Sequence, residues 1–163
     1  MTVTASASTA RVVAAALDDT WRVATPLTPV GFYPRAGVIP AVVAVHDQTG
    51  PWDAVGRTRR LELSDGSSVV ESLVRVEPDG VFVYELSRFT GLLGRLVTGG
   101  RADWSYSSTP NGRTRVDWTY SFFARPGRGL IVRGIVRFAW APYMRRVLVG
   151  IAREVERVGQ SAA

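Results

Sequence analysis

Glu71 is the residue whose type and surroundings most favour chemistry in this chain. It lies in the apolar run SVVESLVRVE (68–77), where the alternation of a strand sets it on one face with Val69 and Leu73. Both faces of that strand are largely apolar, so the position of the carboxylate stays open. It points inward, or it lies on a solvent face, or it pairs with a neighbouring-strand arginine such as Arg59. Burying a carboxylate without a partner costs several kcal/mol, so an inward Glu71 calls for Arg59 or a polar ligand group as its complement.

Aromatic side chains form a second candidate group, because they alternate along three predicted strands and therefore share one face of the sheet. Two roles are open for them: packing of the core against a helix, or lining of a pocket in which the polar tips of Tyr and Trp orient a ligand. The residues are Phe82, Tyr84, Trp104, Tyr106, Trp118, Tyr120 and Phe122.

Several kinds of chemistry are excluded by composition. The chain has no cysteine, and all 20 of its basic residues are arginine, so thiolate nucleophiles and lysine Schiff bases are ruled out. Its one histidine, His46, is followed by Asp47, but neighbours on a strand point to opposite faces, which makes a His–Asp dyad there unfavourable. We therefore predict neither a metal site nor a cofactor, and we identify no catalytic residue.

Turn chemistry and periodicity predict the elements that position these residues. Asp65-Gly66, Asp79-Gly80 and Asn111-Gly112 separate β-rich runs and are typical of hairpin turns. The expected order is a short strand at 2–8, a helix capped by Thr9 and ending near Trp21, an ordered loop from Pro26 to Pro40, an antiparallel meander of about six strands over 41–124, and a long helix over 128–158, kinked at Pro142. This pattern predicts an α+β fold and a single domain at 1–160.

The sequence TGPWDAVGRTRRLELSDGSSVVESLVRVEPDGVFVYEL, the later TRVDWTYSFFARP and the arginine-rich apolar helix at the end resemble the START-like (SRPBCC) superfamily of polyketide cyclases, lipid-transfer proteins and Bet v 1 relatives. The resemblance implies a helix-grip fold, in which a curved sheet wraps a long C-terminal helix around an apolar cavity. It also implies that Glu71 faces that cavity, as a matching Glu does in the plant hormone receptors of the superfamily. By the same resemblance, Ser64–Gly66 and the glycines of 91–94 and 99–100 form gate loops; plain connecting loops are the alternative.

The charge of the chain is unevenly distributed. The formal net charge is +6, and residues 125–163 hold eight arginines but only Glu154 and Glu156. An arginine-rich helix face is either simply solvated or makes weak contact with an anionic membrane surface. The segment lacks the aromatic interleaving and motifs of nucleic-acid binding, so no nucleic-acid partner is expected. Without an apolar span or a signal-peptide pattern, the expected location is cytoplasmic.

Two functions are consistent with these observations. The first is binding or transport of a hydrophobic small molecule, lipid or polyketide-like, with Glu71, Arg59, Phe82, Tyr84, Trp104, Trp118 and Tyr120 as candidate ligand-binding residues. The second is a cyclase or aromatase of polyketide type, in which Glu71, Tyr84 or Tyr120 handles protons. The sequence favours binding, because catalysis needs a positioned group of matched pKa and no pair of residues is committed to that task.

Overall fold

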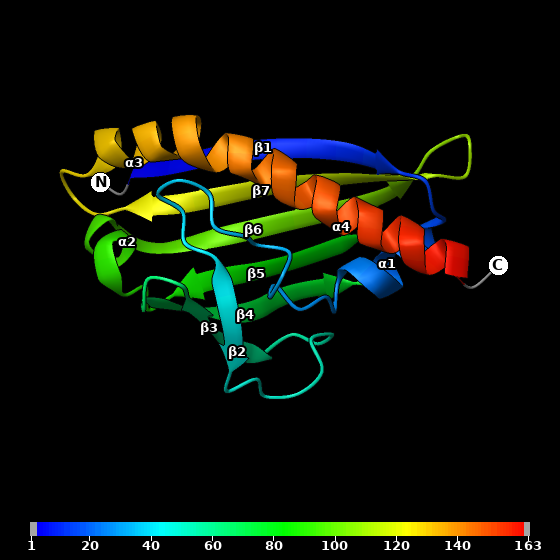
Figure 1. Ribbon diagram of the computed structural model, residues 1–163, viewed down its shortest axis with the longest axis horizontal. Coiled ribbons are helices and arrows are strands. Elements are labelled where there is room, and N and C mark those ends of the chain that lie inside the picture. Colours follow the sequence, from blue (N-terminus) through cyan, green and yellow to red (C-terminus); the bar gives the residue numbers. More distant parts are fainter. Residues whose placement is uncertain (1–2, 162–163) are drawn as a thin grey trace.

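A seven-stranded antiparallel sheet frames the molecule in the computed structural model, which describes residues 3–161. The strands are β1 (Val3–Val13), β2 (Val42–His46), β3 (Thr58–Leu63), β4 (Ser68–Glu77), β5 (Val81–Ser87), β6 (Val97–Ser108) and β7 (Thr114–Ala124). Their order in the sheet is β1-β7-β6-β5-β4-β3-β2, so the meander from β2 to β7 is continuous and β1 joins its far edge (Figure 1). The predicted meander over 41–124 is confirmed.

The predicted turns lie where the sequence put them. Gly66 and Gly112 adopt φ values of +81° and +69°, and Asp79 adopts +58°. This left-handed region suits glycine and tolerates Asp in tight turns, which explains why the Asp-Gly and Asn-Gly pairs predicted the hairpins.

The N-terminal prediction is wrong in its boundaries. The chain stays extended to Val13, and helix α1 spans only Leu17–Ala24, whereas a helix starting after Thr9 was expected. The reason is tertiary: β1 pairs with β7 along its whole length, from Val3 opposite Ala124 to Val13 opposite Thr114. Pairing on this scale satisfies the backbone donors and acceptors and overrides a local helical preference. Residues 1 and 2, with which the predicted strand and domain begin, lie outside the described part.

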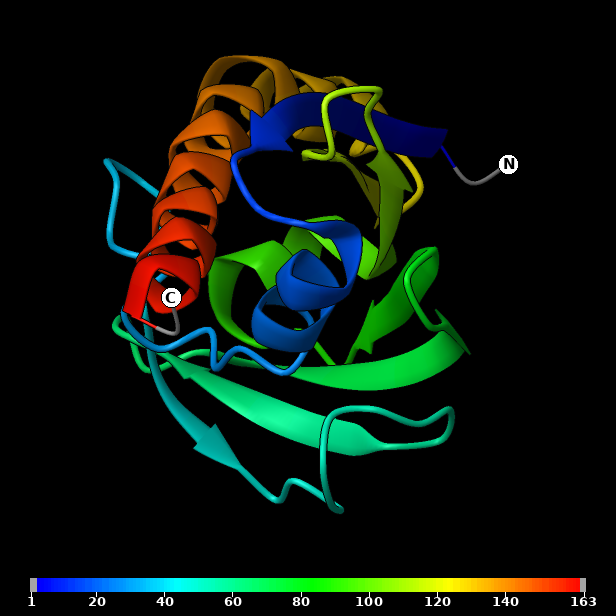
Figure 2. The same ribbon diagram turned by 90° about the vertical axis from the view of Figure 1, so that its right-hand side faces the viewer.

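The C-terminal helix packs across the concave face of the sheet. It comprises α3 (Gly129–Ile135), the π-helical segment η1 (Val136–Trp140) and α4 (Ala141–Ser161). Figure 2 shows the sheet curving around α4 (red), with α1 (blue) between helix and sheet at that end. This arrangement is the α+β helix-grip fold that was predicted.

The helix is irregular just before Pro142. The Ala141 amide donates to the Val136 carbonyl, five residues back, which is the π-helical pattern. Proline has no N–H for the ordinary bond to the carbonyl of residue 138, so the interruption near Pro142 follows from its chemistry.

Two glycine-rich segments differ from the predicted loops. Residues 91–94 belong to a short helix, α2 (Gly91–Leu96), and Gly99 and Gly100 lie within β6. A Cβ on Gly100 would come within 2.9 Å of the Ser121 carbonyl oxygen, so this glycine lets two strand backbones approach closely.

Candidate functional site

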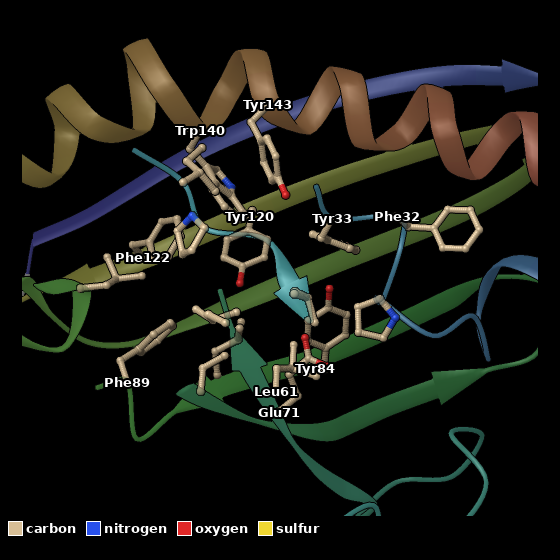
Figure 3. A pocket seen from close by; sticks show the side chains of 18 of the residues that line it. Phe32, Tyr33, Leu61, Glu71, Tyr84, Phe89, Tyr120, Phe122, Trp140 and Tyr143 are labelled. Carbon is tan, nitrogen blue, oxygen red and sulfur yellow. The ribbon is translucent and has the colours of Figure 1, made fainter. Parts of the chain in front are cut away.

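An internal cavity of about 360 Å³ lies between the concave face of the sheet and the C-terminal helix (Figure 3). Its wall is mostly apolar, and 12 of the lining residues are aromatic. The aromatic lining residues are Phe32, Tyr33, Trp52, Phe82, Tyr84, Phe89, Trp104, Tyr106, Tyr120, Phe122, Trp140 and Tyr143. This volume and composition are typical of small-molecule sites, which range from about 300 to 1,000 Å³.

An ion pair between Arg59 and Glu71 is the charged feature of the wall. The two residues are directly opposite each other on β3 and β4, and both side chains point to the inner face. Arg59 Nε donates to Glu71 Oε2 at 2.6 Å, and each side chain is only 6% exposed. The Arg59 guanidinium also lies 4.0 Å from the centroid of the Trp52 ring, a cation–π contact. The Arg59 guanidinium is therefore held by two contacts, the Glu71 carboxylate and the Trp52 ring, before any ligand enters.

Three tyrosines lie near this pair. Burial raises the pKa of Tyr84, and the neighbouring Glu71 carboxylate raises it further. Burial also raises the pKa of Tyr33 and of Tyr120, with smaller contributions from Tyr84 and Glu71. All three phenols therefore stay protonated at neutral pH and can donate a hydrogen bond to a ligand oxygen. Figure 3 shows Tyr84 and Glu71 on the sheet side, with Tyr120 reaching toward the same space.

The helix supplies the opposite wall. Trp140 at the end of η1 and Tyr143 in α4 both point from the helix toward the sheet (Figure 3). The Tyr143 hydroxyl donates to the Pro34 carbonyl at 2.9 Å, which ties the 26–40 loop to the helix. The indole Nε1 atoms of Trp140 and Trp52 are buried and have no hydrogen-bond partner among residues 3–161.

The structure brings together six of the seven residues predicted from the sequence. Glu71, Arg59, Phe82, Tyr84, Trp104 and Tyr120 all line the cavity. The inward position of Glu71 and its pairing with Arg59 are confirmed, whereas their role toward a ligand stays a prediction.

Trp118 was predicted in the pocket and does not line it. It is fully buried, and its ring stacks on Trp104 with centroids 4.3 Å apart. The edges of Tyr33 and Tyr120 close over it, with centroids 6.2 and 6.1 Å away. Alternation correctly places Trp118 on the inner face, but the neighbouring rings separate it from the cavity.

Sequence reasoning missed the part of the wall that comes from outside the sheet. Trp140 and Tyr143 come from the helix, Phe32 and Tyr33 from the proline-rich loop, and Trp52 from the segment before β3. The spacing of three between Trp140 and Tyr143 places both on one helix face, and this was an available signal.

His46 lies away from this site. Its Nε2 is 2.7 Å from Glu62 Oε2 across β2 and β3, and neither residue lines the cavity. In the part of the chain that the structure describes, no group of three or more His, Cys, Asp or Glu side chains could hold a metal ion.

The cavity reaches the surface at the end where α2 and α3 lie. Val38 and Leu92 line the cavity and are nevertheless 81% and 71% exposed. The turn between β3 and β4 contacts two other segments near this opening. Ser64 Oγ accepts a hydrogen bond from the Ala41 amide, which follows the 26–40 loop. Ser67 packs against Gly91 at the start of α2, so closely that a Cβ on this glycine would lie 2.9 Å from the Ser67 Cβ. The predicted gate segments 64–66 and 91–94 therefore border the mouth, while Gly99 and Gly100 are part of the sheet. At the other end α1 closes the space, where Trp21 packs edge-on against Phe82 and Tyr106.

Solved structures share this architecture. Norcoclaurine synthase from Thalictrum flavum, in a truncated form, superimposes with a TM-score of 0.71 at 18% identity, covering 94% of each chain. A protein from Nitrosospira multiformis gives 0.66 at 15% identity, covering 92% of this chain and 95% of that one. Ara h 8.0201 gives 0.61 at 14% identity, covering 97% and 99%. At these identities the likeness concerns the fold alone.

Sequence comparison is more specific. A search of curated proteins found no significant match. The sequence profile of one family, described as "Polyketide cyclase / dehydrase and lipid transport", matches residues 4–156, nearly the whole chain. Together with the helix-grip architecture, this match shows that the chain belongs to the polyketide cyclase/dehydrase and lipid transport family.

Proposed function

We propose that the protein binds and carries a hydrophobic small molecule, lipid or polyketide-like, in the cavity between sheet and helix. The observation that carries the proposal is a mostly apolar cavity of about 360 Å³ with one buried ion pair, Arg59–Glu71, in its wall. Such a site favours a ligand with an apolar body and a polar group near the pair. The protonated phenol of Tyr84 suits an oxygen acceptor on that ligand.

Native mass spectrometry of the freshly purified protein tests the proposal directly. We expect a co-purified lipid or polyketide-like mass that is lost on denaturation. Val69 lies on the inner face of β4 and lines the cavity, so Val69→Trp should fill it and abolish the adduct. Val70→Trp is the matched control, because the next residue of a strand points to the other face. Binding in this cavity would be contradicted if the adduct persists in Val69→Trp. It would also be contradicted if the wild-type protein carries no adduct, either as purified or after exposure to lipid extract.

An enzyme of cyclase type is the second candidate, since a buried carboxylate and phenols face the same space. Glu71 is already held by Arg59 at 2.6 Å, which leaves it less suited to act as a free general base. Glu71→Gln separates the two functions. For a carrier, it should change ligand affinity by at most about 1–3 kcal/mol, the scale of one hydrogen bond to a charged group. For a cyclase, affinity should stay nearly intact while turnover falls by about 10²–10⁴-fold.

A further inference from the structure

Large apolar side chains are exposed at the mouth end of the molecule. On the C-terminal helix, Leu130 is 83% exposed, Ile131 48% and Phe138 76%, while Leu92 on α2 is 71% exposed. Helices α2 and α3 lie at the same end of the molecule (Figure 1). The connection before α3 contacts α2, since Arg125 Nε donates to the Gly94 carbonyl at 2.9 Å. A group of this kind on a protein surface marks an interaction site more often than an isolated exposed leucine does.

The helix presents three different surfaces here. Val132, Ile135 and Val136 line the cavity. Arg133 and Arg137 border a shallow groove beside β1. Leu130, Ile131 and Phe138 cover the remaining side, which faces solvent. The apolar side chains are therefore not part of the core and have no covering element in residues 3–161.

The charged side chains of α2, α3, η1 and the connection before α3 are all arginines. Five exposed arginines belong to α2, to α3 and η1, or to the connection before α3: Arg95, Arg125, Arg128, Arg133 and Arg137. Within residues 3–161 none of the five forms an ion pair. The sequence has no Asp or Glu from 86 to 102 or from 118 to 153. One carboxylate, Asp65, also lines the cavity in the 64–66 turn at the mouth. Its pKa is lowered by hydrogen bonds from Ser67 and, more weakly, by the charge of Arg35.

From these observations we infer that the mouth end is a docking surface for an anionic lipid bilayer. Leu92, Leu130, Ile131 and Phe138 enter the boundary between headgroups and acyl chains, and the arginines contact lipid phosphates. The Arg137 guanidinium lies 5.3 Å from the centroid of the Phe138 ring, so one charge and one inserted ring are held together. The C-terminal arginines alone suggested weak electrostatic contact; the structure adds the apolar component and restricts the surface to α2, α3 and η1. Docking does not depend on what the cavity holds.

Flotation with vesicles tests the inference without any knowledge of the ligand. The probes are vesicles of phosphatidylcholine with 30% phosphatidylglycerol, and vesicles of phosphatidylcholine alone. We expect the wild-type protein to bind the anionic vesicles, to bind less as salt rises, and to bind the neutral vesicles far more weakly. No binding to anionic vesicles at low salt would overturn the inference. Binding of this protein to an acidic protein, with no binding to vesicles, would also overturn the inference.

Apolar variants identify the inserted side chains. Leu130→Gln with Phe138→Gln should lower the partition coefficient by about a hundredfold, because each large apolar side chain withdrawn from the interface costs about tenfold. The matched control is Val43→Gln with Val55→Gln, two residues outside α2, α3 and η1 that are 46% and 61% exposed. It should bind within about twofold of the wild type. An equal loss in both variants would exclude a localised surface.

Arginine variants test the location of the electrostatic contact. Arg128→Gln, Arg133→Gln and Arg137→Gln together should lower binding by about a hundredfold, at about fivefold for each arginine near a charged membrane. Arg145→Gln, Arg146→Gln and Arg153→Gln remove the same charge from exposed positions on α4 and should have much less effect. If the two triple variants lose binding equally, net charge and not the mouth end drives it, and the inference fails.

Discussion

The Arg59–Glu71 pair is the residue-scale feature that makes this cavity more than an apolar hollow. Both side chains are almost fully buried, and the register of β3 and β4 places them directly opposite each other. Taking two charges out of water is costly, and the geometry offsets that cost with a short hydrogen bond and the Trp52 ring. A buried pair of this kind often contributes little net stability, so its position in the cavity wall favours a role in ligand orientation.

Breaking the pair should therefore destabilise the protein more than removing it. Glu71→Ala leaves Arg59 buried and unpaired, and we expect it to lower the free energy of unfolding by about 3–5 kcal/mol. Arg59→Met with Glu71→Leu removes both charges and should recover most of that loss. Urea denaturation followed by circular dichroism measures both. Arg75→Ala serves as a control, because its pair with Glu77 is exposed and should contribute less than about 1 kcal/mol. A double variant as unstable as Glu71→Ala would show that the pair itself is stabilising.

At the scale of elements, the closely paired centre of the sheet depends on glycine in β6. Gly100 lies opposite Phe122 of β7, and the backbone of that strand leaves no space for a side-chain carbon. Helix α3 offers the opposite case, since a Cβ on Gly134 would meet nothing within 4 Å.

The same substitution should consequently have opposite effects in the two elements. Gly100→Ala should destabilise the fold by about 1–3 kcal/mol, because the added carbon must displace strand backbone. Gly134→Ala should stabilise it by about 0.5–1 kcal/mol, since alanine favours the helix. Thermal or urea unfolding of the two variants under the same conditions checks the pair. Equal stabilities for both would contradict the close strand approach.

At the scale of the whole molecule, the aromatic interior depends on the sheet, the loop and the helix together. The chain has five tyrosines, and burial raises the pKa of every one of them: Tyr33, Tyr84, Tyr106, Tyr120 and Tyr143. They come from the 26–40 loop, three strands and α4, so their titration reports on the assembled structure.

This arrangement predicts alkaline unfolding. Above about pH 10 the unfolded chain releases its phenolic protons while the folded state retains them. The contribution of the buried tyrosines to the free energy of unfolding is therefore complete below that pH and is lost as the pH rises. Each tyrosine contributes up to about 1.4 kcal/mol per pH unit. Phenolate absorbance at 295 nm should therefore appear together with the loss of circular dichroism. A reversible titration near pH 10 in a protein that keeps its native spectrum would contradict the burial of these phenols.

The sequence by itself determined the features that depend on local chemistry. Asp-Gly and Asn-Gly pairs fixed the hairpins, because few other residues tolerate the left-handed backbone of these turns. Alternation placed Glu71 on one strand face with Val69 and Leu73, and the resemblance to the START-like superfamily implied that this face is the inner one. The three-to-four spacing predicted the long helix. These patterns, with the resemblance to the START-like superfamily, sufficed for the fold and for six of the seven predicted lining residues.

Only the tertiary structure decided what depends on contact between distant segments. Pairing with β7, more than 100 residues away, kept β1 extended to Val13 where local propensity favoured a helix. Neighbouring rings covered Trp118 on a face that alternation had assigned correctly, and the π segment before Pro142 carried Trp140 into the cavity wall. Periodicity reports the face on which a side chain lies, whereas exposure on that face is set by the segments that pack against it.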